Sequence, residues 1–255
     1  MDDDDSGTGL PASIEAAWGL RARPNKGPRP GLSLERIVEA AMRIAAADGL
    51  AAVSMGRVAA DLGVSTMALY RYVAAKDELL ALMVDATAAS PPAGPAPGES
   101  WRVGLSRWAW AELEVHRRHP WGLRIPISGP PATPNQVAWL ERGLQCLRDT
   151  GLAEGEKLSV MLLLTGFVRN WAMLEADLVE AAEAAGGGEP AAMSGYGRLL
   201  ARLIDAERFP ALHAVIDAGV FDEPDGPDDP DAEFVFGLER VLDGIEALVR
   251  ARTPD

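Results

Sequence analysis

The sequence predicts an all-α protein made of a small N-terminal helical domain and a larger C-terminal one. Apolar residues recur every three or four positions, no segment alternates as a half-buried strand does, and glycine- and proline-rich stretches separate the periodic segments. The 255 residues suffice for one large or two small domains. We expect an acidic tail and a basic arm over 1–31, a first domain over 32–88 and a second over 99–253.

Four helices are predicted in the first domain. Leu34–Asp48 has an apolar face, with Ser33 before it as the N-cap and Gly49 after it as the stop. The other three, of which Ser54 caps the first and Ser65 the second, are expected at Met55–Leu62, Thr66–Val73 and Lys76–Thr87. The four prolines of the segment 90–98 then interrupt regular structure, so this segment is a connector.

The second domain is predicted to be helical throughout. Its helices are expected at Trp101–His116, Asn135–Thr150, Glu154–Ala185, Ser194–Glu207 and Phe234–Val249. The polar stretches Gly186–Pro190 and Asp222–Asp231 are expected to be loops. At the N-terminus we expect a short helix near Ile14–Trp18 and an extended arm over Arg21–Gly31, where three prolines exclude a regular helix.

The charge of the chain is unevenly distributed. A net charge of −14 argues against binding nucleic acid, because phosphate contacts require lysine and arginine. However, residues 21–80 carry nine bases and six acids, whereas the first 20 residues carry five acids and no base. A basic module attached to an acidic one is typical of a protein of which one part meets a polyanion, and chance variation between segments is the alternative.

The composition also limits the compartment. No apolar stretch approaches the roughly 20 residues that span a bilayer, and four aspartates follow Met1, so we expect neither a membrane span nor a signal peptide. The single cysteine, Cys146, excludes an intramolecular disulfide and fits a reducing compartment. We therefore expect a cytoplasmic protein without a membrane partner.

Residues 55–73 predict two short helices joined by a turn. Such a pair forms a helix-turn-helix, whose second helix enters the major groove of DNA. Gly63 permits the turn, and the inner face carries Val58, Ala59 and Leu62. The outward positions of the second helix are Thr66, Met67, Arg71 and Tyr72. Arg71 has the donor pattern for a bidentate contact with a guanine edge.

The segment from Arg36 to Asp85 resembles the DNA-binding domain of the TetR family of bacterial regulators. The matching pattern is A-x-x-L-G-V-S-x-x-x-L-Y-x-Y-V-x-x-K-x-E-L-L, within RIVEAAMRIAAADGLAAVSMGRVAADLGVSTMALYRYVAAKDELLALMVD. The resemblance implies that double-stranded operator DNA is contacted by Ser54, Arg57, Ser65, Thr66, Met67, Ala68, Tyr70, Arg71, Tyr72 and Lys76. Thr66, Met67 and Arg71 then lie toward bases, while Tyr70, Tyr72 and Lys76 hold the backbone.

Simpler roles remain open for several of these residues. The tyrosines also suit packing, and Lys76 also suits a solvated turn. The arm from Arg21 to Arg29 suits either minor-groove contact or a plain basic linker.

The C-terminal domain resembles that of the tetracycline repressor subgroup. This resemblance rests on two segments, FVFGLERVLDGIEALV near the C-terminus and TPNQVAWLERGLQCLRDTGL earlier in the domain. It implies a homodimer bound to a palindromic operator, with the last helix and the long helix from Glu154 forming a four-helix bundle. The predicted interface residues on the last helix are Phe234, Leu238, Val241, Leu242 and Ile245. A plain buried core helix is the alternative for the long one.

The same resemblance implies that the C-terminal domain binds a small lipophilic effector. Isolated polar residues and tryptophans on apolar helices are the candidate lining: Trp108, His116, Trp139, Met161, Thr165, Arg169, Asn170 and Trp171. Core packing is the alternative for each. The segment RIPISGPPA lacks the histidine that the subgroup implies for a magnesium–tetracycline site, so tetracycline is disfavoured.

The sequence offers little for catalysis. His116 and His119 lack the flanking carboxylates of a zinc motif, and the glycines at 186–188 do not form a phosphate loop. We expect no enzyme, no metal and no cofactor, but a ligand-responsive DNA-binding regulator acting as a repressor. A regulator controlled by a protein partner or by abundance is the alternative, and a helical enzyme is the remote one.

Overall fold

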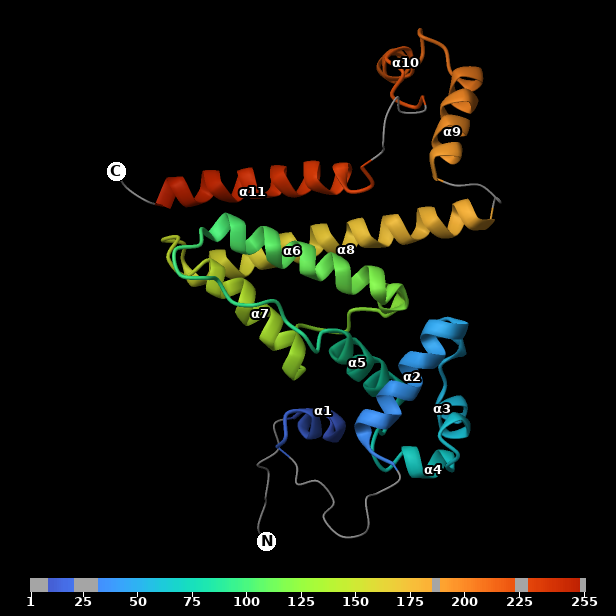
Figure 1. The fold of residues 1–255 in the computed structure, drawn as a ribbon, viewed down its shortest axis with the longest axis vertical. Helices are drawn as coiled ribbons and strands as arrows, with labels where there is room; N and C mark the ends of the chain where they lie inside the picture. The colour runs from blue at the N-terminus through green and yellow to red at the C-terminus, as the bar shows by residue number, and fades with distance from the viewer. Residues whose placement is uncertain (1–8, 21–31, 185–188, 223–228, 253–255) are drawn as a thin grey trace. The chain divides into compact units, whose positions relative to one another are not determined.

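The computed structural model describes residues 9–20, 32–184, 189–222 and 229–252, without the side chains of 189–194. Within these ranges every regular element is a helix (Figure 1). The described residues among 1–169 and 241–255 form one compact unit, and those among 170–240 form a second. The predicted basic arm at 21–31 lies outside the described residues.

The first unit begins with the elements of the predicted N-terminal domain. These are α1 (Ala12–Ala17), α2 (Leu34–Asp48), the 3-10 turn η1 (Leu50–Ala52), α3 (Met55–Asp61), α4 (Thr66–Leu69) and α5 (Lys76–Thr87). Three predicted caps are confirmed, since the side chains of Ser33, Ser54 and Ser65 accept from backbone N–H groups three residues later. Gly49 ends α2 with a φ of +79°, a value that favours glycine.

An apolar core holds these helices together. Ile37, Val53, Val58, Leu69 and Leu79 are fully buried in it, so α2, α3, α4 and α5 all contribute. Burying side chains of this size stabilises by about 1.5–3 kcal/mol each. The core also takes in Ile14 from α1 and, from much later in the chain, Trp121 and Ile125.

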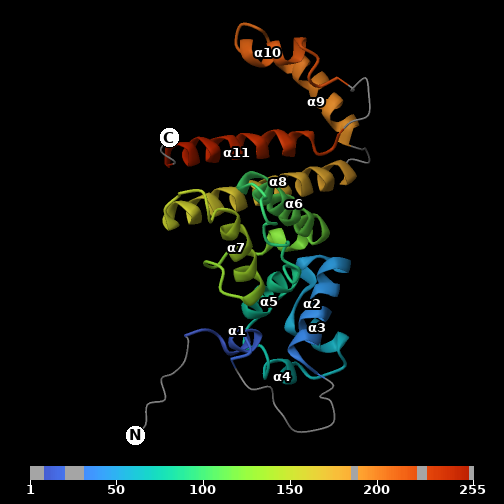
Figure 2. The ribbon, with the colours of Figure 1, turned by 60° about the vertical axis from the view of Figure 1, so that its left-hand side comes forward.

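The later elements are the longer helices. They are α6 (Trp101–Arg118), the 3-10 turn η2 (Pro120–Arg124), α7 (Pro134–Cys146), α8 (Glu154–Ala184), α9 (Glu189–Leu203), α10 (Pro210–Asp217) and α11 (Ala232–Arg252). In Figures 1 and 2, the N-terminal part of α8 and the C-terminal part of α11 run side by side in opposite directions. An ion pair of 2.6 Å from Arg252 to Glu156 joins these two ends.

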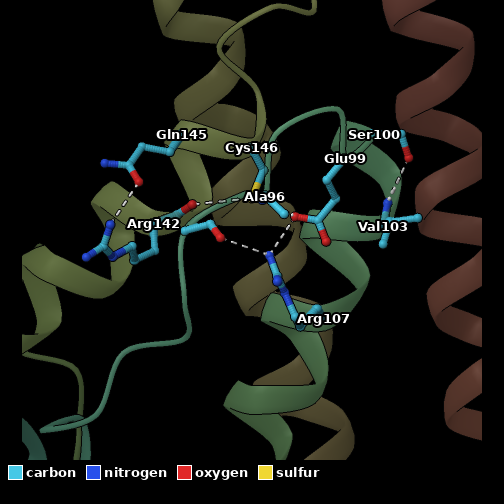
Figure 3. Close-up of polar contacts among 9 residues, drawn as sticks. Ala96, Glu99, Ser100, Val103, Arg107, Arg142, Gln145 and Cys146 are labelled. Atoms are coloured by element: carbon cyan, nitrogen blue, oxygen red, sulfur yellow. Dashed lines mark hydrogen bonds and ion pairs between the residues drawn. The ribbon is translucent and has the colours of Figure 1, made fainter.

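The proline-rich connector is fixed to the start of α6 (Figure 3). The Glu99 carboxylate accepts from the backbone N–H of Ala96 and forms an ion pair of 2.9 Å with Arg107. Beside them α6 and α7 approach closely, because a Cβ at Gly104 would lie 2.8 Å from Sγ of Cys146. Cys146 is therefore a buried packing residue, and it is a free thiol.

Four predicted boundaries are wrong. The recognition helix α4 ends at Leu69 rather than Val73, and residues 70–73 follow it as a turn in which Val73 is buried. The helix α7 stops at Cys146, because the hydroxyl of Thr150 turns back to the carbonyl of Leu147. Helix α9 starts at Glu189, inside a stretch predicted as a loop, and ends at Leu203. Helix α10 was not predicted, since eight residues show too little periodicity.

Candidate DNA-binding and effector sites

Helices α3 and α4 form a helix-turn-helix around Gly63. Gly63 has a φ of +67°, and its N–H and that of Val64 bond to the carbonyls of Ala60 and Ala59. The turn therefore satisfies the last carbonyls of α3 while the chain reverses into α4. Leu69 anchors α4 in the core with no exposed surface.

Several of the predicted DNA-contacting residues, on α4 and in the turn that follows it, are exposed to solvent. Met67 and Tyr70 are exposed by 74% and 45%, and Arg71 is exposed as well. Within the described part of the chain, Arg71 forms no ion pair with a carboxylate. Residues 67–71 thus present an apolar side chain, a phenol and a cation to solvent.

The remaining predicted contacts are divided between solvent and the protein. Lys76 begins α5 and is exposed. The exposed Arg57 forms an ion pair of 2.7 Å with Asp48. Tyr72 is half-buried, and its hydroxyl donates to the carbonyl of Leu32 over 3.1 Å. Ser54 and Ser65 cap their helices and are exposed, whereas Thr66 and Ala68 are half-buried.

Three of the predicted effector residues pack against one another. Trp108 donates from Nε1 to the carbonyl of Trp139, and the two rings meet edge to face at 5.9 Å. Trp139 in turn donates to the carbonyl of Ala88 over 2.8 Å. Met161 lies against Gly143, where an added Cβ would overlap with its Cε. Both indole N–H groups are therefore already used, and these side chains form a close-packed wall.

A polar cluster formed by residues of α6 and α8 contains His116 and Arg169, which were both predicted to bind the effector. Arg169 is joined there by Glu112, one turn before His116 on α6, with Oε1 of Glu112 4.0 Å from Nε2 of His116. Burial raises the pKa of Glu112 to about 8, although the positive charge of Arg169 opposes the rise. Burial, aided by the charge of Arg169, lowers the pKa of His116 to about 4. At neutral pH the cluster therefore contains a protonated carboxyl, a neutral imidazole and one cation.

This cluster is not saturated with hydrogen bonds. Oε2 of Glu112 and Nε2 of His116 are buried and have no partner within the described part of the chain. Such groups cost about 1–3 kcal/mol each when nothing pairs with them. Sequence reasoning missed Glu112, although the spacing E-x-x-x-H places it one turn before His116 on the same face of α6.

The other predicted effector residues are placed differently. Thr165 is half-buried one turn before Arg169 on α8. Asn170 is exposed, and Trp171 is half-buried with its ring 6.2 Å from that of Phe234 in the second unit. Among the described residues, no group of three acidic, histidine or cysteine side chains is arranged to hold a metal ion.

Besides the bond from Trp139 to Ala88, two further features of the described residues connect the helix-turn-helix module to the following helices. The buried carboxylate of Asp85, near the end of α5, accepts from the backbone N–H groups of Asn135 and Gln136 over 2.9 and 3.2 Å. It thereby caps α7, whose own cap residue Thr133 makes no capping bond. The second contact is η2, which inserts Trp121 and Ile125 into the core of the module.

The predicted interface residues on α11 are mostly internal to the protomer. Phe234, Leu238, Leu242 and Ile245 are buried, and Val241 is half-buried. On α11 Phe236 is exposed by 62%, and on α8 Leu158 is exposed by 51% and Leu162 by 77%. Beside them a groove of about 530 Å³ runs between α8 and α11, lined by residues that include Val160, Leu163, Gly244 and Leu248. No described helix has the length and apolarity needed to cross a membrane.

Comparison with known proteins agrees with this architecture. The model of the Tetracyclin repressor-like C-terminal domain matches residues 94–249, and that of the bacterial regulatory proteins of the tetR family matches residues 37–83. The HTH-type transcriptional repressor DrrR1 of Streptomyces coeruleorubidus is 38% identical over 97% of this chain and 90% of its own.

Two solved structures of the TetR family protein ActR from Streptomyces coelicolor are also similar. The complex with actinorhodin has a TM-score of 0.72 and 29% identity, covering 86% of this chain and 97% of that one. The complex with (S)-DNPA has a TM-score of 0.68 and 28% identity, covering 86% and 98%. The predicted all-α fold and the prediction of a non-enzymatic regulator are confirmed. The chain belongs to the TetR family of bacterial regulatory proteins and is a helix-turn-helix transcriptional regulator.

Proposed function

We propose that this protein is a homodimeric repressor that binds a palindromic operator and is released from it by a small-molecule effector. Regulators of the family bind operator DNA and small-molecule effectors. The repressor DrrR1 is similar over nearly the whole chain, which supports repression rather than activation. The observation that carries the effector assignment is the unsaturated polar cluster of Glu112, His116 and Arg169.

Operator binding is assigned to the exposed side of α4 and to the start of α5. Arg71, in the turn after α4, has the reach and the donors to read a base edge, whereas Tyr70 and Lys76 suit phosphate oxygens. Arg57, Ser54, Ser65, Thr66, Met67 and Ala68 complete the proposed contact set. The bond from Tyr72 to Leu32 favours a supporting role for that tyrosine.

The effector is assigned to the region of the polar cluster. A ligand with an apolar body suits the wall of Trp108, Trp139 and Met161, while its polar group would pair with the unsatisfied atoms of Glu112 and His116. Thr165 lies one turn from Arg169 and is a further anchor. Asn170 and Trp171 are retained as candidates from the sequence alone.

The second copy of the chain is assigned to the face formed by α8 and α11. Leu158 and Leu162 are too exposed for an isolated protomer in water, and the adjoining groove is lined mainly by apolar residues. Val241 and Leu248 border this face from α11. Two copies related by a two-fold axis would bury it and form a four-helix arrangement.

A mobility-shift titration tests the proposal. DNA from upstream of the protein's own coding region is the first probe, and actinorhodin and (S)-DNPA are the first ligands to add. We expect selective retardation that a ligand reverses. Tyr70→Ala should weaken binding across many sequences, and Arg71→Ala should relax the preference at one base position by about 1–3 kcal/mol.

The outcomes separate the candidate functions. Retardation unaffected by both substitutions would contradict the assignment of α4. Selective binding that no ligand in a panel of lipophilic metabolites reverses would instead favour a repressor controlled by a protein partner or by its abundance.

A further inference from the structure

Arg169 connects the polar cluster to a segment that belongs to the DNA-binding module. Its Nη2 donates to the carbonyl of Leu123 over 2.9 Å and to that of Ile125 over 3.2 Å. Arg169 lies on α8, whereas both carbonyls lie in or directly after η2, more than 40 residues earlier in the chain. One guanidinium nitrogen thus holds two backbone carbonyls of the segment 123–125.

The segment held by Arg169 is embedded in the helix-turn-helix module. Trp121 and Ile125 are 7% and 8% exposed and pack in the same core as Ile37, Val58 and Leu69. The turn η2 also lies against η1, which leads into α3. Any displacement of 121–125 would therefore disturb the core that supports α3 and α4, because close-packed cores have few alternative arrangements.

The positive charge of Arg169 also acts on the proposed effector site. It affects the pKa of both Glu112 and His116, so the guanidinium lies within electrostatic range of both side chains. The cluster has two buried atoms without partners but one cation, and that cation is occupied by backbone carbonyls. A ligand oxygen entering the cluster would find Arg169 as the strongest donor and would compete with Leu123 and Ile125 for it.

We propose that Arg169 is the positioning residue that couples this cluster to the DNA-binding module, and that the effector carries an acceptor oxygen, as a carbonyl, phenolate or carboxylate, which withdraws Arg169 from η2. The part of this inference that says what the effector does to Arg169 rests on the proposed effector site. The coupling itself is testable with operator DNA alone, because coupling between two sites is reciprocal. Binding of DNA at α4 must then change the hydrogen exchange of residues 112–126.

Hydrogen exchange of the full-length protein, with and without the retarded upstream DNA fragment, measures this coupling. In the wild type, we expect DNA to slow exchange in the helix-turn-helix and also, by about tenfold, in residues 112–126. In Arg169→Met, we expect faster exchange at 121–126 without DNA and no effect of DNA on residues 112–118. In Arg169→Lys, whose ammonium can donate to both carbonyls, the wild-type pattern should return.

Arg107→Met is the matched control. Like Arg169, Arg107 is a partly exposed arginine that donates to a backbone carbonyl, and it forms an ion pair with Glu99 (Figure 3). It should leave the response of 112–126 to DNA intact. The proposal is overturned if the wild type shows no effect of DNA at 112–126, or if Arg169→Met transmits it unchanged. If Arg169→Met transmits no effect but wild-type DNA binding resists every ligand, the coupling stands and the effector-release function fails.

Discussion

Among the described residues, Glu112 and His116 on α6 have the most strongly shifted pKa values, and both are within range of the charge of Arg169 on α8. Glu112 is held protonated and His116 is held neutral, so the cluster avoids two buried charges and keeps only that of Arg169. In these protonation states the carboxyl of Glu112 can donate a hydrogen bond, and Nε2 of His116 has no partner within the described residues. A protein without a ligand to accommodate would gain stability from apolar side chains here.

The raised pKa of Glu112 predicts a specific pH dependence of stability. The folded protein retains the proton of Glu112 up to about pH 8, whereas the unfolded chain releases it near its ordinary value of 4.5. Stability from this group is therefore full below pH 4.5 and declines until the pH has passed 8. His116, with a pKa lowered to about 4, adds the opposite trend, which ends near pH 6.5.

We expect the melting temperature of the wild type to fall between pH 6.5 and 8, with the free energy of unfolding decreasing by up to about 1.4 kcal/mol per pH unit. Glu112→Gln should flatten this part of the profile, because the amide does not titrate. Thermal melts by circular dichroism at half-unit pH steps provide the measurement. An equal slope in the variant would show that Glu112 is ionised in the folded protein.

At the scale of elements, each long helix has one face that the protomer covers and another that it leaves exposed. On α11, Phe234, Leu238, Leu242 and Ile245, which the sequence predicted as dimer-interface residues, are all buried within the single protomer. On α8, Val160, Met161 and Leu164 are buried, whereas Leu158, Leu162 and Leu163 are exposed by half or more. Residues 160–164 are apolar on all sides of α8, so two surfaces must cover this part of the helix.

Leu162→Glu should therefore abolish the proposed dimer. A charge at the centre of an apolar interface remains desolvated and unpaired, which costs several kcal/mol across the two copies. Sedimentation velocity should show a monomer, and operator affinity should fall by at least about a hundredfold because one protomer reads only one half-site. Ile127→Glu, at an apolar side chain that is 72% exposed outside this face, is the control. A Leu162→Glu variant that stays dimeric would place the interface elsewhere.

At the scale of the whole molecule, positive charge is scarce in the helix-turn-helix module. Residues 32–88 contain five bases and seven acids, so the helix-turn-helix module is itself slightly acidic. Two of the five, Arg43 and Arg57, form ion pairs with Asp61 and Asp48. The four bases between residues 21 and 29 are the largest remaining concentration of positive charge near α2 in the sequence.

We therefore expect those four bases to account for much of the electrostatic attraction to DNA. Replacing Arg21, Arg23, Lys26 and Arg29 with alanine should reduce the slope of log K against log salt by about 0.9 for each phosphate that the variant no longer neutralises. Fluorescence anisotropy with an operator duplex over a salt series measures the slope. An unchanged slope would assign this segment a linker role. The alanine variant of the exposed Arg198, Arg202, Arg208 and Arg250, which also removes four positive charges, controls for net charge.

The sequence by itself determined the local structure. The N-caps at Ser33, Ser54 and Ser65 and the turn at Gly63 follow from backbone hydrogen bonding and φ, which depend on neighbouring residues only. The core face of α2 follows from its periodicity for the same reason. The short recognition helix and α10 were mispredicted, since tertiary packing sets where such short helices end.

Only the tertiary structure decided what the polar residues of the second domain do. His116 and Arg169 were recognisable as isolated polar groups, but their partner Glu112, the carbonyls of Leu123 and Ile125, and the insertion of Trp121 into another module lie far apart in the sequence. Burial of a side chain and the choice of its long-range partner depend on how helices pack. That arrangement is a property of the whole core, which no local pattern encodes.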